Sequence, residues 1–335
     1  MKTTFRNLAD LATLPYFKID DGRLVLRDKS IGPVIDMHTH VALAYLAPNQ
    51  VDYERLSAET KHYLPACCSI DLDVYQNKNI PTPDLEALKS DLTMGSFRRG
   101  GMRATHTAAN LLREMDELGI ERTAILAIDF PVISKNYEVA AALARKHGRF
   151  VAFGSVHPYA LNIDKAIDEQ IALGVMGIKL HPNVQVFRPD SRRAAKMYKA
   201  CGDRGLVVLI HCGPVGIASA LGDYLTQVRW YEDPIRKHPN TKFVLAHAGA
   251  LQFAEATELA AKYPNVYLEL SGQSITGLRL MIERVDPSRI LLGSDWPFYH
   301  QAIVMAKVLM ATESDKKLRR DILYNNAVKL LNLPN

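Results

Sequence analysis

Two histidines separated by one residue follow an apolar stretch near the start of the chain. The segment from Pro33 to Leu43 reads PVIDMHTHVAL, and its histidines are His38 and His40. Alternate residues of a strand share a face, so both imidazoles point to one side, with about 7 Å of rise between their backbones. Two such imidazoles can hold one metal ion. An isolated H-x-H also fits one rim residue and one hydrogen-bonded core residue, so its meaning depends on the rest of the chain.

Further polar residues stand where other apolar runs end. They are Lys179 and His181 after one run, His211 and His247 after two others, and Asp295 in the sequence GSDWP. The chain contains eleven histidines, and chance would place one or two of them at such positions rather than this set. Taken alone, His181 could serve only to position the loop before Pro182. Together, the residues predict one shared site.

The set is complete for metal-assisted hydrolysis, because neutral imidazoles and a carboxylate are typical ligands of a catalytic zinc ion. Such an ion keeps about three protein ligands and an open position for water. It lowers the pKa of that water from about 16 towards 7 and polarises a substrate carbonyl. A carboxylate placed like Asp295 can bind the ion, accept the water's proton and return it to the leaving group. Asp36, two residues before His38, is either an acceptor for an imidazole N–H or a buried structural carboxylate.

Eight short apolar runs of strand type divide the chain. They span 33–38, 123–128, 150–156, 175–180, 206–211, 242–247, 266–270 and 289–294. Helical spacing of apolar residues appears between them, for example over Ala108–Leu118, which stops at Gly119 as a helix with a C-terminal glycine does. Asn162 and Asp190 are candidate caps of two further helices, and an amphipathic helix is predicted from Asp315 to Leu331.

Strands that alternate with helices in this order predict an α/β protein with a parallel sheet, and eight such units predict a (β/α)8 TIM barrel. We expect the whole chain, residues 1–335, to form this single domain. The candidate residues all stand at the carboxyl ends of strands, which form the catalytic face of such a barrel. The predicted architecture therefore brings them together.

Two segments exceed a minimal barrel. Residues 1–32 form an N-terminal extension, in which Tyr16–Asp28 predicts a hairpin around Asp21 and Gly22. Residues 41–104 form an insertion after the first strand that is far longer than an ordinary βα loop. Loops at this position rise over the catalytic face, so we expect the insertion to act as a lid.

Five residues are candidate substrate contacts. Arg98, Arg99 and Arg103 near the end of the insertion could hold a substrate carboxylate in a bidentate fork. Three solvated arginines on the surface are the alternative for this cluster. His181 and Trp296 flank the predicted site in sequence and complete the set.

The composition is that of an ordinary globular protein. The 335 residues are 48% hydrophobic and 23% charged, with a formal net charge of +5. The basic clusters are short and lack interleaved aromatic residues, so we expect a small-molecule substrate and no nucleic-acid partner. Four cysteines without a C-x-x-C motif predict free thiols in the reducing cytoplasm. No segment reads as an export signal or membrane span, and a homodimer stays open beside a monomer.

The H-x-H motif, the histidines after the fifth and sixth strands and the aspartate in GSDWP resemble the amidohydrolase superfamily, specifically its amidohydrolase-2 branch. The resemblance runs from about Val34 to the helix that contains NNAVKLL. It implies a divalent metal, usually zinc, bound by four residues, with one further residue as metal ligand or catalytic acid/base. The implied ligands are His38, His40, His211 and Asp295, and the further residue is His247. The branch hydrolyses lactones and amides, hydrates double bonds and decarboxylates aromatic or unsaturated acids.

Lys179 departs from this pattern, because the decarboxylases of the branch lack a lysine there. In other amidohydrolases such a lysine is carboxylated and bridges two metals, which favours hydrolysis. A charged Lys179 that turns towards an anionic substrate or Glu269, beside a single metal, is the alternative that we prefer. We therefore expect a hydrolase of a C–O or C–N bond, with a metal-dependent decarboxylase or hydratase as the second candidate. A barrel that only binds is less favoured, because no ligand is missing.

Overall fold

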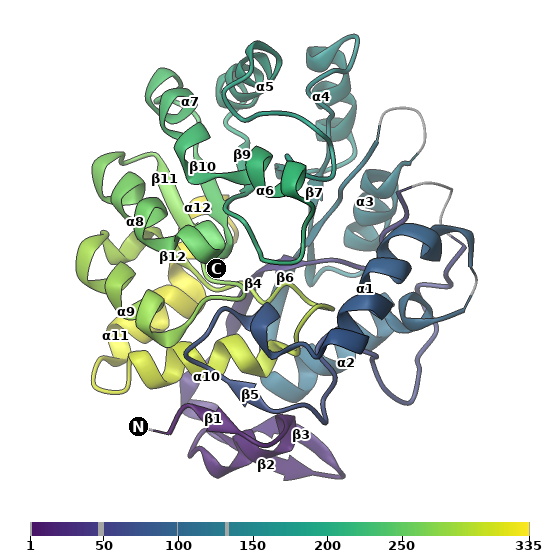
Figure 1. Ribbon diagram of the computed structural model, residues 1–335, viewed down its shortest axis with the longest axis vertical. Helices are drawn as coiled ribbons and strands as arrows, with labels where there is room; N and C mark the ends of the chain where they lie inside the picture. The colour runs from purple at the N-terminus through teal and green to yellow at the C-terminus, as the bar shows by residue number, and fades with distance from the viewer. Residues whose placement is uncertain (1, 46–49, 99, 131–133, 335) are drawn as a thin grey trace.

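A computed structural model describes residues 2–45, 50–98, 100–130 and 134–334. Its central feature is a barrel of eight parallel strands, which Figure 1 shows surrounded by helices. In barrel order the strands are β4 (Val34–Thr39), β6 (Ile120–Leu126), β7 (Phe150–Gly154), β8 (Gly177–Leu180), β9 (Val207–His211), β10 (Phe243–Ala246), β11 (Val266–Glu269) and β12 (Ile290–Leu291). The predicted (β/α)8 TIM barrel is confirmed.

Main-chain hydrogen bonds join the first strand of the barrel to the last. Met37 N donates to Leu292 O at 2.9 Å, and Asp295 N donates to His38 O at 2.8 Å. The strand predicted over 289–294 is much shorter in the structure, where regular pairing ends at Leu291. This closure places Asp295 directly beside His38, although the two lie near opposite ends of the sequence.

Helices connect successive strands and cover the outside of the barrel. They are α2 (Ala108–Leu118), α3 (Asn136–Lys146), α4 (Ile163–Ala172), α5 (Arg192–Asp203), α6 (Ala220–Thr226), α7 (Glu232–Lys237), α8 (Phe253–Lys262), α9 (Ile275–Arg284) and α10 (Gln301–Ala311). Gly119 ends α2 with a φ of 68°, and Asn162 caps α4, both as predicted. The predicted cap Asp190 is wrong: Ser191 caps α5, and Asp190 forms an ion pair with Arg188 instead.

Apolar side chains fill the inside of the barrel. The inward-facing cluster comprises Ile35, Met37, Ala124, Leu126, Val151, Phe153, Val207, Leu209, Val244, Ala246 and Leu291. Leu330 and Leu331 of the last helix, α12 (Asn326–Leu331), pack into the same cluster. The helix predicted from Asp315 to Leu331 is one helical run, in which α11 (Lys316–Arg320) and α12 flank a π-helical turn. The barrel therefore has a packed core.

The N-terminal extension contains the predicted hairpin. β2 (Phe17–Asp20) pairs with β3 (Arg23–Leu26), and the two residues between them have φ values of 47° and 73°. Two consecutive left-handed residues favour the sequence Asp-Gly and match the twist of the strands they connect. Leu24 and Leu26 are buried against the rest of the protein, so the hairpin is anchored to the barrel by its apolar face.

The extension also pairs with the insertion, and this contact was not predicted from the sequence. β1 (Thr4–Phe5) pairs in antiparallel fashion with β5 (Ile70–Asp71), and the two lie side by side at the bottom of Figure 1. Leu8 N donates to Ala66 O at 2.9 Å, which adds a second link. The two strands of this small sheet thus come from the N-terminal extension and from the insertion, the two segments outside the minimal barrel.

The insertion lies over the carboxyl ends of the strands. After β5 it contains α1 (Thr82–Met94), which is drawn in dark blue in Figure 1. Gln76 N donates to Gly272 O at 2.9 Å, and Ile275 N donates to Leu72 O at 3.1 Å, so the insertion docks on the segment after β11. This placement agrees with the prediction that the insertion covers the carboxyl ends of the barrel strands. That the insertion moves as a lid stays a prediction.

The four cysteines, all within the described residues, are free: Cys67 is exposed, Cys68 half-buried, and Cys201 and Cys212 buried. Across the described ranges, the helices fall short of the length and apolarity needed to cross a membrane.

Candidate active site

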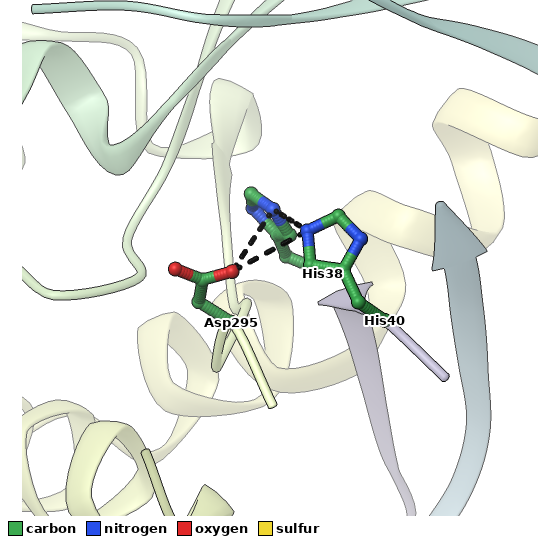
Figure 2. Close-up of side chains that lie close together, drawn as sticks. All are labelled: His38, His40 and Asp295. Carbon is green, nitrogen blue, oxygen red and sulfur yellow. Dashed lines mark hydrogen bonds and ion pairs between the residues drawn. The ribbon is translucent and has the colours of Figure 1, made fainter. Parts of the chain in front are cut away.

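Three of the predicted metal ligands converge at the carboxyl ends of β4 and β12. The Nε2 atoms of His38 and His40 lie 3.1 Å apart, and Asp295 Oδ1 lies 3.4 Å from each of them. Figure 2 shows the carboxylate facing both rings. All three residues are buried, the most accessible being Asp295 at 7%. This spacing allows one ion to contact all three ligand atoms.

Hydrogen bonds on the far side of each ring determine which nitrogen faces the site. His38 Nδ1 lies 2.6 Å from Glu269 Oε2, and His40 Nδ1 lies 2.8 Å from the carbonyl oxygen of Leu126. Because a carbonyl oxygen only accepts, His40 Nδ1 carries a proton and its Nε2 presents a lone pair. Burial raises the pKa of Glu269 to about 8, and with Glu269 ionised His38 Nδ1 likewise donates and its Nε2 presents a lone pair. Two lone pairs and the Asp295 carboxylate oxygen at such short range repel one another unless a cation lies among them. The donor set therefore fits a divalent metal.

Asp36 supports the junction of β4 and β12 and does not contact an imidazole. Its Oδ1 accepts from His38 N at 3.1 Å and from Ser294 N at 2.9 Å, and its Oδ2 accepts from Gln301 Nε2 at 2.6 Å. Burial raises the pKa of Asp36 to about 6, against the effect of these hydrogen bonds. The imidazole acceptor is Glu269 instead, so of the two roles considered for Asp36 the structural one holds.

His247 faces the same space from the end of β10. Its ring centroid lies 5.0 Å from that of His38. His247 Nδ1 lies 2.8 Å from Ser271 Oγ, and Ser271 Oγ donates to Glu269 Oε2 at 2.9 Å. The hydroxyl proton is thus committed to Glu269, so His247 Nδ1 must donate and its Nε2 presents a lone pair. This is the state required of a metal ligand or a general base.

His38, His40 and His247 form one side of a cluster of imidazole rings, the ring cluster. His211 and His181 form its opposite side. Their rings stack with centroids 4.1 Å apart, and His211 lies 4.7 Å from His247 by the same measure. Within the described residues, the buried His211 Nδ1 has no hydrogen-bond partner. Two groups of described residues place their ligand atoms within 4.8 Å of one another, His38–His40–Asp295 and His38–His247–Glu269, and His211 belongs to neither. Its role as a ligand thus stays a prediction.

Lys179 reaches the centre of the site. Its Nζ lies 3.2 Å from His38 Nε2, and only 1% of the residue is exposed. The strand face is crowded as predicted, because a Cβ on Gly177 would lie 2.3 Å from the Phe153 ring. Burial lowers the pKa of Lys179 to about 8, while Asp295 and Glu269 act to raise it. The amine thus lies within hydrogen-bonding distance of one of the proposed ligand atoms.

The surroundings keep the imidazoles neutral. Burial and the nearby Lys179 charge lower the pKa of His38 well below its usual range and that of His211 to about 3. Burial and the neighbouring His211 lower the pKa of His247 in the same direction. Neutral imidazole is the form that binds metals, so the rings are ready to bind an ion near neutral pH.

A cavity of about 390 Å³ opens above these residues. Its polar end is formed by the ring cluster, Lys179 and Asp295. Its walls are mainly apolar and aromatic, and they include Tyr45, Tyr75, Leu88, Leu92, Phe130, Phe298 and Tyr299. A site with a polar end and apolar walls is typical of small-molecule binding.

Of the four predicted substrate contacts that the structure describes, His181 alone lines this cavity. Arg98 is exposed at the surface, and Arg99 lies outside the described residues. Arg103 is 2% exposed and Trp296 is fully buried, with its Nε1 donating to Glu114 Oε2 at 2.9 Å. Neither residue is part of the cavity wall, and neither is Arg98, so the role of these three residues as substrate contacts stays a prediction that the cavity lining does not support.

Several wall residues come from the insertion and were missed. Tyr75 and Asn77 line the cavity, as do Leu88 and Leu92 of α1. Asn77 Oδ1 accepts a hydrogen bond from the Tyr299 hydroxyl. No periodicity or spacing in the sequence marks these residues. Ser271, by contrast, follows a strand end in the same way as the predicted ligands, so that signal could have identified it.

A family model described as amidohydrolase matches residues 35–333, and the chain belongs to this family. The predicted resemblance is thereby confirmed. A search of curated proteins finds no match.

Solved structures share the fold at low sequence identity. An uncharacterised TIM-barrel protein from Bordetella bronchiseptica is 18% identical, with a TM-score of 0.61 over 90% of this chain and 99% of that chain. A probable 2-pyrone-4,6-dicarboxylic acid hydrolase from Acinetobacter baumannii is 12% identical, with a TM-score of 0.56 over 90% and 100%. A 5-carboxyvanillate decarboxylase from Novosphingobium aromaticivorans, complexed with manganese and a nitrobenzoic acid, is 14% identical, with a TM-score of 0.58 over 91% and 98%.

Proposed function

We propose that this amidohydrolase-family protein is a metal-dependent hydrolase of a C–O or C–N bond in a small lactone, ester or amide. The observation that carries the proposal is the convergence of His38 Nε2, His40 Nε2 and Asp295 Oδ1 within 3.4 Å at the polar end of the cavity. When bound, a divalent ion supplies a Lewis acid that polarises a carbonyl and makes water nucleophilic near neutral pH. Zinc is the ion we propose, because histidine and carboxylate ligands suit it.

The chain itself provides the groups that move protons. Asp295 lines the cavity, so its carboxylate can accept the proton of an attacking water and return it to the leaving group. His247 presents an Nε2 lone pair to the same space and is the second candidate acceptor. The apolar walls exclude bulk water, which strengthens the electrostatic interactions inside.

Lys179 is the group we assign to an anionic part of the substrate. Its Nζ stands at the polar end of the cavity beside His38, where an ammonium can pair with a carboxylate. We propose that it does so beside a single metal. Its carboxylation, followed by bridging of a second metal, is the alternative.

A second candidate function is the decarboxylation of an aromatic acid. The observation that favours it is the aromatic lining, to which Tyr75, Phe130, Phe298 and Tyr299 contribute. In this reaction Asp295 would deliver a proton to the ring carbon as CO₂ leaves. The fold likeness to a 5-carboxyvanillate decarboxylase supports keeping this candidate.

One experiment separates the two functions. Zinc-loaded and manganese-loaded protein is incubated with a panel of lactones, esters and amides and, separately, with a panel of phenolic carboxylates. We expect acid release from the first panel, measured by titration at constant pH, and no CO₂ from the second. Release of CO₂ without hydrolysis would replace the proposal by the decarboxylase. Inactivity on both panels with metal bound would contradict both functions. The Asp295→Asn variant, measured in parallel, controls for contaminating enzymes.

A further inference from the structure

His247 begins a main-chain turn of unusual conformation. His247, Ala248 and Ala250 have φ values of 58°, 43° and 50°, and Gly249 between them has a φ of 84°. Residues other than glycine rarely adopt such values, and each costs on the order of 1 kcal/mol or more. Such a turn persists only where its surroundings hold it in place.

The turn has no room to shift towards β9. A Cβ placed on Gly213, two residues after His211, would lie 1.8 Å from the carbonyl oxygen of Gly249. The two loops therefore touch main chain to main chain. A change in the turn would alter the distance between the His211 and His247 rings, whose centroids lie 4.7 Å apart.

A single side chain holds both ends of the turn. Gln273 Nε2 donates to His247 O at 2.6 Å and to Ala250 O at 2.9 Å. Gln273 is 2% exposed and lies in the segment between β11 and α9. Both amide protons are thus used on the two carbonyl groups that frame the turn, and neither bond involves the cavity.

A buried lysine in turn holds Gln273. The Nζ of Lys307, on α10, donates to the main-chain carbonyl oxygen of Gln273. Lys307 is 2% exposed and does not line the cavity. Lysine is almost never fully buried unless it is paired, because desolvation of its amine is costly. Its presence here is unexplained by packing alone, since methionine would fill similar space without that cost.

We infer that Gln273 and Lys307 are positioning residues for His247. Lys307 fixes the main chain of Gln273, Gln273 fixes the strained turn, and the turn directs the His247 ring. Ser271 then orients the ring itself through Nδ1. The inference rests on the proposed function only for the catalytic role of His247. A displacement of about 1 Å in such a group can lower a rate about a hundredfold, so remote support of this kind affects catalysis.

Hydrogen exchange measures the turn without reference to activity. The full chain is compared with Gln273→Ala, Lys307→Met and Asn326→Ala, and exchange is followed in the peptide that covers 247–252. Asn326 is a matched control, because its Nδ2 also donates to two main-chain carbonyl groups, those of Pro287 and Ile290 at 2.8 Å. We expect exchange in this peptide to be at least tenfold faster in the first two variants and unchanged in the control. The loss of global stability of each variant is measured by urea denaturation, and variants with equal losses are compared.

Milder variants cover the case in which these chains do not fold. Gln273→Asn shortens the amide, and Lys307→Gln keeps an N–H donor, so each should show a smaller increase than its partner variant. Unchanged exchange in every Gln273 and Lys307 variant, or equal acceleration in the control, would overturn the inference. Once a substrate is found, the same variants should lose at least tenfold in kcat with KM within twofold. Failure of the hydrolase proposal would leave the exchange result intact, so the two ideas fail separately.

Discussion

At the scale of single residues, the geometry predicts different losses for two of the proposed metal ligands. His38→Ala removes an imidazole and should lower zinc occupancy at least tenfold, because the remaining atoms no longer enclose the ion. Asp295→Asn keeps an oxygen ligand but cannot accept a proton, so it should retain the metal and lose about 10² or more in kcat. Elemental analysis and initial rates measure the two effects.

His157→Ala is the control for this pair. His157 is half-buried, its Nε2 lies 2.8 Å from Gln185 O, and it does not line the cavity. Its replacement should leave metal content unchanged. Equal metal loss in the His38 and His157 variants would show that the ion is bound elsewhere.

The number of metals depends on Lys179. With its amine 3.2 Å from His38 Nε2, we expect about one metal per chain and a bare lysine, even with bicarbonate present. Lys179→Met should then keep the metal and raise KM for acidic substrates. Metal content near two per chain, with electron density beyond Nζ in a crystal grown with bicarbonate, would instead establish the carboxylated form.

Lys307 predicts a pH dependence of stability. Burial lowers its pKa to about 7 in the folded protein, although Asp71 and Asp73 act to raise it, and an unfolded lysine titrates near 10.4. Between these values the unfolded chain binds more protons, so the free energy of unfolding rises with pH, by up to about 1.4 kcal/mol per pH unit. Lys307→Met should flatten this rise. Urea denaturation at pH 7.5 and 9.5 tests it, and equal slopes for the two proteins would contradict it.

Histidine, lysine and aspartate at the ends of apolar strands predicted the position of the site, because packing of an apolar core does not require such residues there. His38, His40, His181, Lys179 and Asp295 stand where the parallel barrel places them. Arg103 and Trp296 are buried outside the cavity wall, and the sequence does not reveal on which side of a loop a side chain is buried. The hydrogen-bond partner of Lys307 could not be predicted from the sequence either, because it is a main-chain carbonyl group, which every residue has.

At the scale of elements, β4 shows where strict alternation fails. Ile35 and Met37 point into the barrel, so regular alternation would send His38 outward. The pairing of β4 with β6 shifts register between Asp36 and Thr39, and His38 lies within this shift. Irregularities of this type redirect side chains next to active sites. The sequence predicted the strand and its histidines, whereas the shift depends on pairing with a strand that follows the long insertion.

The elements that repeat were predictable, and those that do not repeat were not. Eight apolar runs and the helices between them follow rules of periodicity, which hold without knowledge of neighbours. β1 and β5 each contain two residues, too few for any pattern, and they exist only because they pair with each other. Element ends were less accurate, as the shift of a cap from Asp190 to Ser191 shows.

α1 predicts how the insertion limits substrate size. Leu92 lines the cavity from this helix, whereas Ala87 on the same helix is exposed and does not. Leu92→Trp should fill part of the space and raise KM for bulky substrates at least tenfold, and Leu92→Ala should admit larger ones. Ala87→Trp, which adds equal bulk outside, should leave KM unchanged. Equal effects of the two tryptophans would show that the cavity wall is not formed by this face.

At the scale of the whole molecule, the extension should stabilise the insertion. Phe5 is 1% exposed and belongs to β1, so Phe5→Asp would place a charge in an apolar contact and break the β1–β5 pairing. We expect faster proteolysis within 50–98 and a higher KM, with little change in the melting of the barrel. Ile19→Asp, at an exposed position of the hairpin, is the control. Proteolysis that is unchanged by Phe5→Asp would contradict this coupling.

The antiparallel pairing of β1 with β5 also bears on how this barrel can acquire new substrates. The insertion supplies much of the cavity wall, and the extension grips it through β1 and through the bond from Leu8 to Ala66. The two segments are therefore joined in the structure, although the first barrel strand separates them in sequence. A recombined enzyme that receives the insertion without residues 1–32 would lack the β1 strand that pairs with it. We therefore expect a transfer of substrate specificity between such barrels to require both segments together.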